Sequence, residues 1–153
     1  MSVLFPLRLA PGDVIGVTAP SSGVPEHLHP RLELAIKNLK KRGYQVREGR
    51  CLRSQHKNKS ATKFSRVEEL MSYLTDPDIK AVMPPWGGDL AMELLDLIDF
   101  DLLSRSKPKW FVGFSDLREG ANKQVISSQA DSLIKISRIW ADFFPANTSN
   151  QPI

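Results

Sequence analysis

The apolar positions of the first 117 residues alternate between short β-branched runs and helical stripes. Asp13 to Ala19 is a β-branched run, which predicts a first strand. Apolar residues then recur at i, i+3, i+4 and i+7, which predicts an amphipathic helix over 30–42. Pro30 suits the first turn of that helix, and Gly43 suits the position just after its end. A second strand is expected over 44–48.

The same alternation continues after a polar, basic loop over 49–60. A second helical stripe follows the loop, with apolar residues at Ala61, Phe64, Val67, Leu70, Met71 and Leu74. Ser65 and Glu68 have the spacing of a capping box, although the apolar pattern favours a helix start nearer Ser60. The remaining predicted elements are a strand over 79–83, short helices over 92–95 and 99–104, and a strand over 110–114.

Connections of this length between strands are too long for hairpins, so the strands are predicted to be parallel. The expected fold class is α/β, an open and mostly parallel sheet of the Rossmann-like or flavodoxin-like kind, with helices on both faces. In such sheets ligands bind at the carboxyl ends of the strands. Polar or small residues and one tryptophan follow three of the predicted strands there, and we expect them to line one pocket: Ser21, Ser22, Trp86, Gly87, Asp89, Ser115 and Asp116.

The pattern changes after Leu117. Helical spacing returns between Ile126 and Phe144, and the last stretch, ANTSNQPI, has the polar composition of a disordered segment. We therefore expect one domain over 1–117 and a divergent tail over 118–153 that is poorly ordered and belongs to a truncated product.

Composition narrows the class of protein. The chain has 153 residues, 41% hydrophobic and 25% charged, which is ordinary for one globular domain. It has no apolar run near the ~20 residues that span a bilayer and no signal-peptide pattern at its start. A single cysteine, Cys51, suits a reducing compartment. These features predict a cytoplasmic location and no membrane partner.

The net charge of +4 comes partly from ten Lys and Arg residues between Lys37 and Lys63. Such a run could bind nucleic acid or an acidic ligand. No aromatic side chains alternate with the charges to stack on bases, so a solvated surface is favoured and nucleic acid is not expected.

The Gly87-Gly88 pair follows a predicted buried strand. Glycine tolerates the positive φ of a tight turn and lets a substrate approach the backbone N–H groups. A helix N-terminus near Asp89 would add free donors, and together these are the components of an oxyanion hole. The local residues taken alone favour a simpler reading, a strand-to-helix turn capped by Asp89.

The wider pattern resembles a known family. The segments TAPSSG, LTDPDIKAVM, WGGDLAMELL, IDFDLL and KPKWFVGFSD occur in the order and spacing of the LD-carboxypeptidase family. These serine peptidases include muramoyltetrapeptide carboxypeptidases and microcin C self-immunity proteins. The resemblance runs from about Pro6 to Leu117 and covers the N-terminal domain of the family. It implies hydrolysis of a terminal residue from a murein tetrapeptide or a related peptide conjugate.

The resemblance assigns roles around the turn. Gly87 and Gly88 match the two glycines of the family, and the nucleophilic serine corresponds to Ala91. The backbone N–H groups of Gly88 and Met92 match the oxyanion donors, and Ser115-Asp116 matches a motif at the end of the fourth strand. Because Ala91 has no hydroxyl, it cannot attack a carbonyl group.

No other residue is expected to replace the nucleophile or its partners. The family takes its catalytic glutamate and histidine from a C-terminal domain, and His27, His29 and His56 all precede the turn. Ser21, Ser22 and Ser115 have no His or Lys placed by sequence to activate them. Two loop histidines without a third ligand do not indicate a metal, and Cys51 is expected to be inert. No metal or cofactor is expected.

Three interpretations follow. The first is a working LD-carboxypeptidase, and the second is a non-catalytic relative, either a binding or regulatory module for a peptide or murein fragment or a functionless truncated product. The third is an unrelated domain that binds phosphate at Gly87-Gly88, but it lacks a P-loop lysine and a dinucleotide glycine pattern. Ala91 favours the second for the chain alone. Whether the chain forms a homodimer is left open.

Overall fold

The computed structural model describes residues 5–113 and 115–119 and contains a four-stranded sheet. The strands are β1 (Val14–Val17), β2 (Gln45–Glu48), β3 (Ile79–Val82) and β4 (Trp110–Phe111). They are ordered β2-β1-β3-β4, and every neighbouring pair is parallel. The predicted α/β fold is confirmed. The prediction of a divergent, poorly ordered tail concerns residues that lie, from 120 on, outside the described part of the chain.

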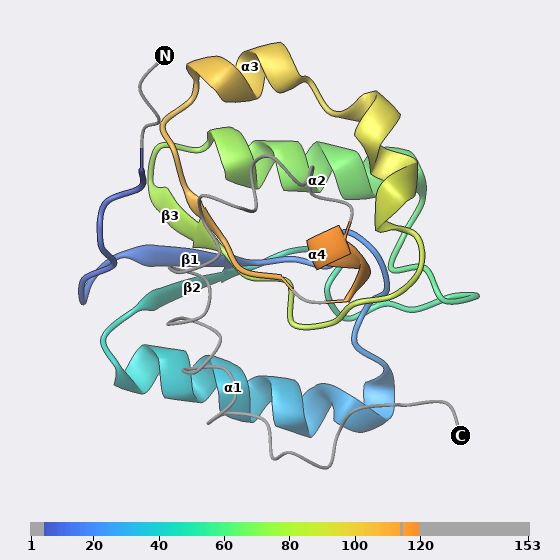
Figure 1. The fold of residues 1–153 in the computed structure, drawn as a ribbon. Helices are drawn as coiled ribbons and strands as arrows, with labels where there is room; N and C mark the ends of the chain where they lie inside the picture. The colour runs from blue at the N-terminus through green and yellow to red at the C-terminus, as the bar shows by residue number, and fades with distance from the viewer. Residues whose placement is uncertain (1–4, 114, 120–153) are drawn as a thin grey trace. The chain divides into compact units, whose positions relative to one another are not determined.

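The helices cover both faces of the sheet, as predicted. The longer ones are α1 (His29–Lys41), preceded by the 3₁₀ turn η1 (Glu26–Leu28), and α2 (Lys63–Thr75). The shorter ones are the 3₁₀ helix η2 (Ala91–Leu97), α3 (Phe100–Arg105) and α4 (Asp116–Glu119). α1 lies on one side of the sheet, and α2 and α3 lie on the other (Figure 1). No described helix is long and apolar enough to cross a membrane.

The strand order determines where a ligand crevice forms. From β1 the chain passes over one face to the edge strand β2, and it returns over the other face to β3. The direction of winding therefore reverses between β1 and β3. In open α/β sheets the crevice opens at the carboxyl ends of the strands at such a reversal. The loops that follow β1 and β3 carry Ser21-Ser22 and Gly87-Gly88.

The boundaries of α1 and α2 show one wrong prediction. α1 ends as expected, with Gly43 just beyond it in the left-handed region at φ +90°. The cap of α2, however, is Thr62, whose side chain accepts the Ser65 backbone N–H at 3.2 Å. Ser65 is therefore the third helical residue rather than the cap, and the proposed Ser65–Glu68 box does not form. The hydroxyl three residues upstream of Ser65 already satisfies that N–H group.

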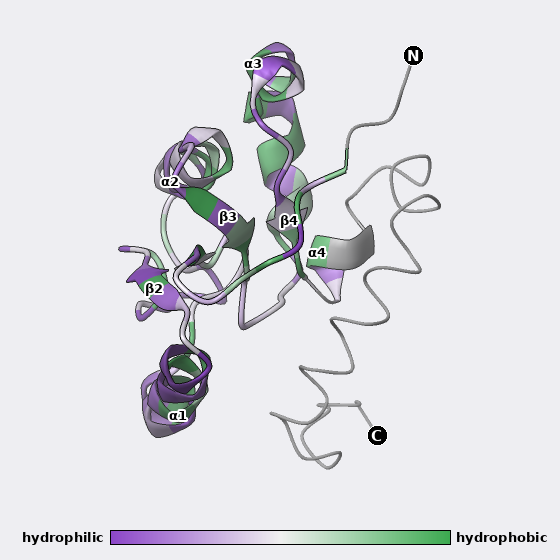
Figure 2. Ribbon diagram, turned by 90° about the vertical axis from the view of Figure 1, so that its left-hand side faces the viewer, coloured by the Kyte–Doolittle hydropathy of each residue, from purple (hydrophilic) through white to green (hydrophobic). Residues whose placement is uncertain are grey.

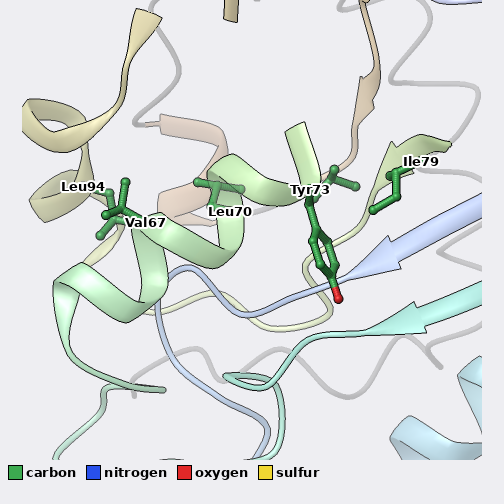
Figure 3. Packing of buried hydrophobic residues seen from close by; sticks show 6 residues of the cluster. Val67, Leu70, Tyr73, Ile79 and Leu94 are labelled. Atoms are coloured by element: carbon green, nitrogen blue, oxygen red, sulfur yellow. The ribbon is translucent and has the colours of Figure 1, made fainter. Parts of the chain in front are cut away.

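The core between α2 and the sheet is built from residues of α2, β3 and η2. Figure 3 shows these side chains packed together, and its labelled members are Val67, Leu70, Tyr73, Ile79 and Leu94. Hydrophobic residues predominate on β3 and hydrophilic ones on the more exposed α1 (Figure 2). Gly16 of β1 makes room for Tyr73, because a Cβ at position 16 would lie 2.5 Å from the ring carbon Cδ2. The missing side chain at Gly16 thus lets α2 pack closely against β1 through Tyr73.

Candidate functional site

Three loops meet at the carboxyl edge of the sheet, as the polar clusters predicted. The Ser21 hydroxyl, after β1, donates to Asp116 Oδ2, after β4, at 2.6 Å. The backbone N–H of Ser22 donates to the carbonyl of Gly87, after β3, at 3.3 Å. Ser21 and Ser22 are both buried. They anchor the loops to one another, whereas Trp86 is half-buried and Asp89 and Ser115 are exposed.

The glycine pair is needed for space and not for backbone conformation. Among the described residues the glycines with positive φ are Gly12 and Gly43, so the expectation of positive φ at Gly87-Gly88 is wrong. A Cβ at Gly87 would lie 2.8 Å from Ser115 Cβ, and one at Gly88 would lie 2.5 Å from Ser22 Oγ. Real Cβ atoms do not approach other atoms so closely, because protein interiors are already close-packed. The glycines therefore let the three loops close together.

The turn enters a 3₁₀ helix, and Asp89 does not cap it. The N-cap of η2 is Leu90, which makes no side-chain cap, so the prediction of a helix capped by Asp89 is wrong. The first N–H groups are satisfied from other loops: the Leu90 N–H donates to Ser21 Oγ, and the Ala91 N–H donates to Asp116 Oδ2, both at 3.1 Å. Side chains distant in sequence thus hold the backbone at Leu90 and Ala91 in place.

Asp116 is the centre of this arrangement. Its Oδ2 accepts from the Ser21 hydroxyl and from the Ala91 backbone, so it links the ends of β1, β3 and β4. Its Oδ1 is buried without a hydrogen-bond partner in the described part of the chain, 3.4 Å from the place a Gly87 Cβ would take. Ser115, just before it, has φ +57°, a strained conformation for a residue with a side chain.

Arg66 is the residue of this region that sequence reasoning missed. It lies in α2, and its guanidinium is fully buried. The Arg66 side chain donates to the carbonyls of Pro20 at 2.9 Å and Leu90 at 3.0 Å, which lie in two of the site loops. It also donates to Glu93 Oε2 of η2 at 2.7 Å and holds the pKa of Glu93 below its ordinary value. The sequence signal for its burial was spacing. Arg66 precedes the buried Leu70 by four positions and therefore lies on the same face of α2.

A second buried charged residue of α2, Glu69, organises the loop after β2. Its carboxylate accepts the Thr18 hydroxyl at 2.5 Å and the Cys51 backbone N–H at 3.2 Å. Burial first, and then the negative charge of Glu69, raise the pKa of the Cys51 thiol to about 11. A thiol with such a pKa is protonated and unreactive near neutrality. The expectation that Cys51 is inert agrees with this environment.

The histidines do not build a second chemical centre. The His29 ring donates to the Val24 carbonyl at 3.0 Å, which gives it a local structural role at the start of α1. His56 lies in the exposed loop between β2 and α2. Across residues 5–113 and 115–119 no three His, Cys, Asp or Glu side chains are grouped so that they could hold a metal ion.

The parallel sheet, with its loops joined at the carboxyl edge, defines an open α/β domain of the Rossmann-like or flavodoxin-like kind. Residues 15–122 match the model of the LD-carboxypeptidase N-terminal domain, and the chain belongs to this family. The expected resemblance is therefore confirmed. The match ends close to the point where the sequence pattern changes.

Curated relatives are similar over the same region. The chain is 33% identical over 115 residues to a putative carboxypeptidase of Vibrio cholerae, covering 75% of this chain and 34% of the relative. It is 34% identical over 112 residues to a probable murein peptide carboxypeptidase of Bacillus subtilis, covering 73% and 34%. The chain thus spans about a third of the length of these relatives.

Solved structures agree on the fold. An MccF-like protein from Bacillus anthracis superposes with a TM-score of 0.70 at 31% identity, covering 76% of this chain and 35% of that one. The microcin C7 self-immunity protein MccF gives a TM-score of 0.72 at 24% identity, covering 88% and 47%, and this likeness shows the fold alone. Structures of MccF include complexes with adenosine monophosphate and with aspartyl sulfamoyl adenosine.

Proposed function

We propose that this chain is a non-catalytic form of the LD-carboxypeptidase N-terminal domain that binds a peptide or murein fragment without cleaving it. The observation that carries the proposal is Ala91. It occupies the position of the family nucleophile, and its N–H is held by Asp116 as part of an intact arrangement of loops. A methyl group in that place cannot form an acyl-enzyme.

The neighbouring hydroxyl groups do not offer a replacement. Ser21 Oγ donates to Asp116, and Ser22 Oγ donates to the Asn58 carbonyl at 2.7 Å, so both are buried and committed within the fold. Ser115 is exposed, but a serine hydroxyl needs a general base within about 3 Å to become a nucleophile. Within the described residues no His or Lys is hydrogen-bonded to any of the three. This supports binding without acyl transfer.

Groups suited to ligand binding remain at the turn. The backbone N–H groups of Gly88 and Met92 donate to no acceptor within the described part of the chain. Gly88 is half-buried and Met92 is exposed, and the family resemblance gives both N–H groups the role of oxyanion donors. Paired N–H donors of this kind bind a carbonyl or carboxylate oxygen. A murein peptide, which the names of the relatives indicate as a substrate class, presents both groups.

Calorimetric titration of the purified chain with murein tetrapeptide tests the proposal, together with an assay for released D-alanine. We expect saturable binding and no D-alanine above the blank. Gly88→Ala should abolish binding, because the added Cβ would lie 2.4 Å from Ser21 Oγ and 2.5 Å from Ser22 Oγ and would push the loop after β1 away from the turn. Gly43→Ala is the matched control: it places a methyl at a strained position at the end of α1 and should lower stability without weakening binding. Release of D-alanine, or no binding, would refute the proposal.

A further inference from the structure

The basic run between Lys37 and Lys63 separates into two kinds of residue in the structure. Several of its arginines are neutralised: Arg47 pairs with Asp76, Arg50 with Glu68, and Arg53 with Glu33 and Glu48. Lys57 makes no ion pair within the described residues, and Lys59 faces Glu93 only at 3.8 Å. In the loop between β2 and α2, the positive charge that lacks a close acidic partner is therefore concentrated at the lysines near residue 57.

Lys57 lies at the tip of a short hairpin, which we define as residues 56–59. His56 and Lys59 form an antiparallel bridge, with N–H to carbonyl distances of 2.8 and 3.0 Å. The two residues between them, Lys57 and Asn58, both have positive φ, 48° and 62°. Such a turn favours glycine and asparagine, and a lysine there persists only where the surroundings hold it.

The surroundings that hold the hairpin belong to the site. Ser22 Oγ donates to the Asn58 carbonyl at 2.7 Å, and Ser22 is, with Ser21, one of the two residues that a Gly88 side chain would strike. Just after the hairpin, the Ser60 N–H donates to the Ser21 carbonyl at 3.1 Å, and its hydroxyl donates to the Ala19 carbonyl at 2.6 Å. These hydrogen bonds fix the hairpin to the loop after β1. In Figure 1 the hairpin belongs to the blue-green segment that extends outward between β2 and α2.

The hairpin and the start of α2 carry three lysines, and the turn carries the exposed Asp89. Lys57 and Lys59 are exposed on the hairpin, and Lys63 begins α2 nearby in the chain. Glu93, which Lys59 faces at 3.8 Å, is also bound by the buried Arg66 at 2.7 Å. A ligand that occupies the Gly-Gly turn and extends past Ser22 therefore meets uncompensated lysine charge.

We propose that the hairpin 56–59 forms a cationic wall of the site and that Lys57 binds an anionic oxygen group of the ligand, a carboxylate or a phosphate. The inference rests on the proposed binding function and specifies the charge of its ligand. An ammonium group suits this role because it attracts either anion as a point charge, without a fixed geometry. The hairpin gives the lysine a defined position that a free loop would not.

Calorimetric titrations with two matched ligand pairs test the inference. One pair is murein tetrapeptide and its C-terminal amide, and the other is adenosine monophosphate and adenosine. In whichever pair binds more tightly, we expect Lys57→Glu to lower the affinity for the anionic member about tenfold and for the neutral member less than twofold. The effect is no larger because exposed charge contacts are individually modest. Lys57→Gln should give a smaller loss, and raising the salt concentration should reduce the difference.

Lys40→Glu, on the exposed side of α1, is the control for net charge and should leave all affinities unchanged. Preference for the peptide pair would assign the anion as a carboxylate, and preference for the nucleotide pair as a phosphate. If murein tetrapeptide binds but Lys57→Glu weakens binding of neutral and anionic members equally, or if Lys40→Glu has the same effect, the inference is wrong while the binding function stands. If no ligand of either pair binds, both are wrong.

Discussion

Replacing Arg66 with methionine should be among the most damaging single changes to this fold. The guanidinium is fully buried and donates to three carbonyls and one carboxylate, at distances from 2.7 to 3.2 Å. Methionine fills a similar volume without a donor, so the carbonyls of Pro20 and Leu90 would lose a charged partner. Those two carbonyls belong to the loops on either side of the Gly-Gly turn.

The magnitude follows from what is left unpaired. A buried carbonyl without a partner costs about 1–3 kcal/mol, and breaking a buried charged arrangement costs about 3–5 kcal/mol. Glu93 is partly exposed and can be solvated again, so we expect a total near the lower limit, about 3 kcal/mol. For a domain of about 100 residues this corresponds to a fall in Tm of roughly 12 °C or more.

Urea denaturation followed by circular dichroism measures the change directly. Arg50→Met is the matched control, because the Arg50 side chain is 77% exposed and its contacts with Glu68 and Glu69 are 3.3 and 4.0 Å long. Its loss should be within about 0.5 kcal/mol. Arg66→Lys, which keeps the charge but cannot reach all four acceptors, should fall between the two. A loss below about 1 kcal/mol for Arg66→Met would refute the view that this arginine holds the site loops together.

Three further outcomes are expected. Gly16→Ala should destabilise the fold by about 1–3 kcal/mol in the same denaturation assay, because the new Cβ would lie 2.5 Å from the Tyr73 ring; an unchanged midpoint would contradict this packing. Cys51, with a pKa of about 11, should not react with a thiol reagent at pH 8 until the chain is unfolded. The Arg66 hydrogen bond lowers the pKa of Glu93, so the contribution of this pair to stability should be lost as pH falls below the ordinary Glu value of 4.5. Arg66→Met should abolish this part of the acid dependence.

Sequence reasoning was sufficient for the fold and for the meeting of the loops. The alternation of strands and helices is a repeated pattern, and parallel connections leave few topologies, so the edge shared by Ser21, Gly87 and Asp116 could be predicted. It was not sufficient for the way the turn is built. Whether a glycine serves backbone conformation or space depends on distant atoms, such as Ser115 beside Gly87, which local sequence does not contain.

The same limit explains Arg66 and Asp89. An arginine in a helix is usually exposed, and only its place on the same face as Leu70 and Tyr73 indicated burial. Asp89 has the side chain of a good cap, but Ser21 and Asp116, distant in the sequence, satisfy the first N–H groups of η2 instead. Capping by residues from other loops is a tertiary effect that a local pattern cannot reveal.

The most direct test of the central claim is D-alanine release from murein tetrapeptide by two fusions that differ at position 91. Each joins this chain to the C-terminal domain of a relative, one with Ala91 and one with Ala91→Ser. The account predicts release by the Ala91→Ser fusion and none above the blank with Ala91. Ala91→Ser without the added domain should stay essentially inactive, because an unactivated hydroxyl is a poor nucleophile. Binding and an oxyanion hole alone can accelerate hydrolysis roughly thousandfold over the reaction in water. A larger acceleration by the Ala91 fusion would contradict the assignment of position 91 as the lost nucleophile.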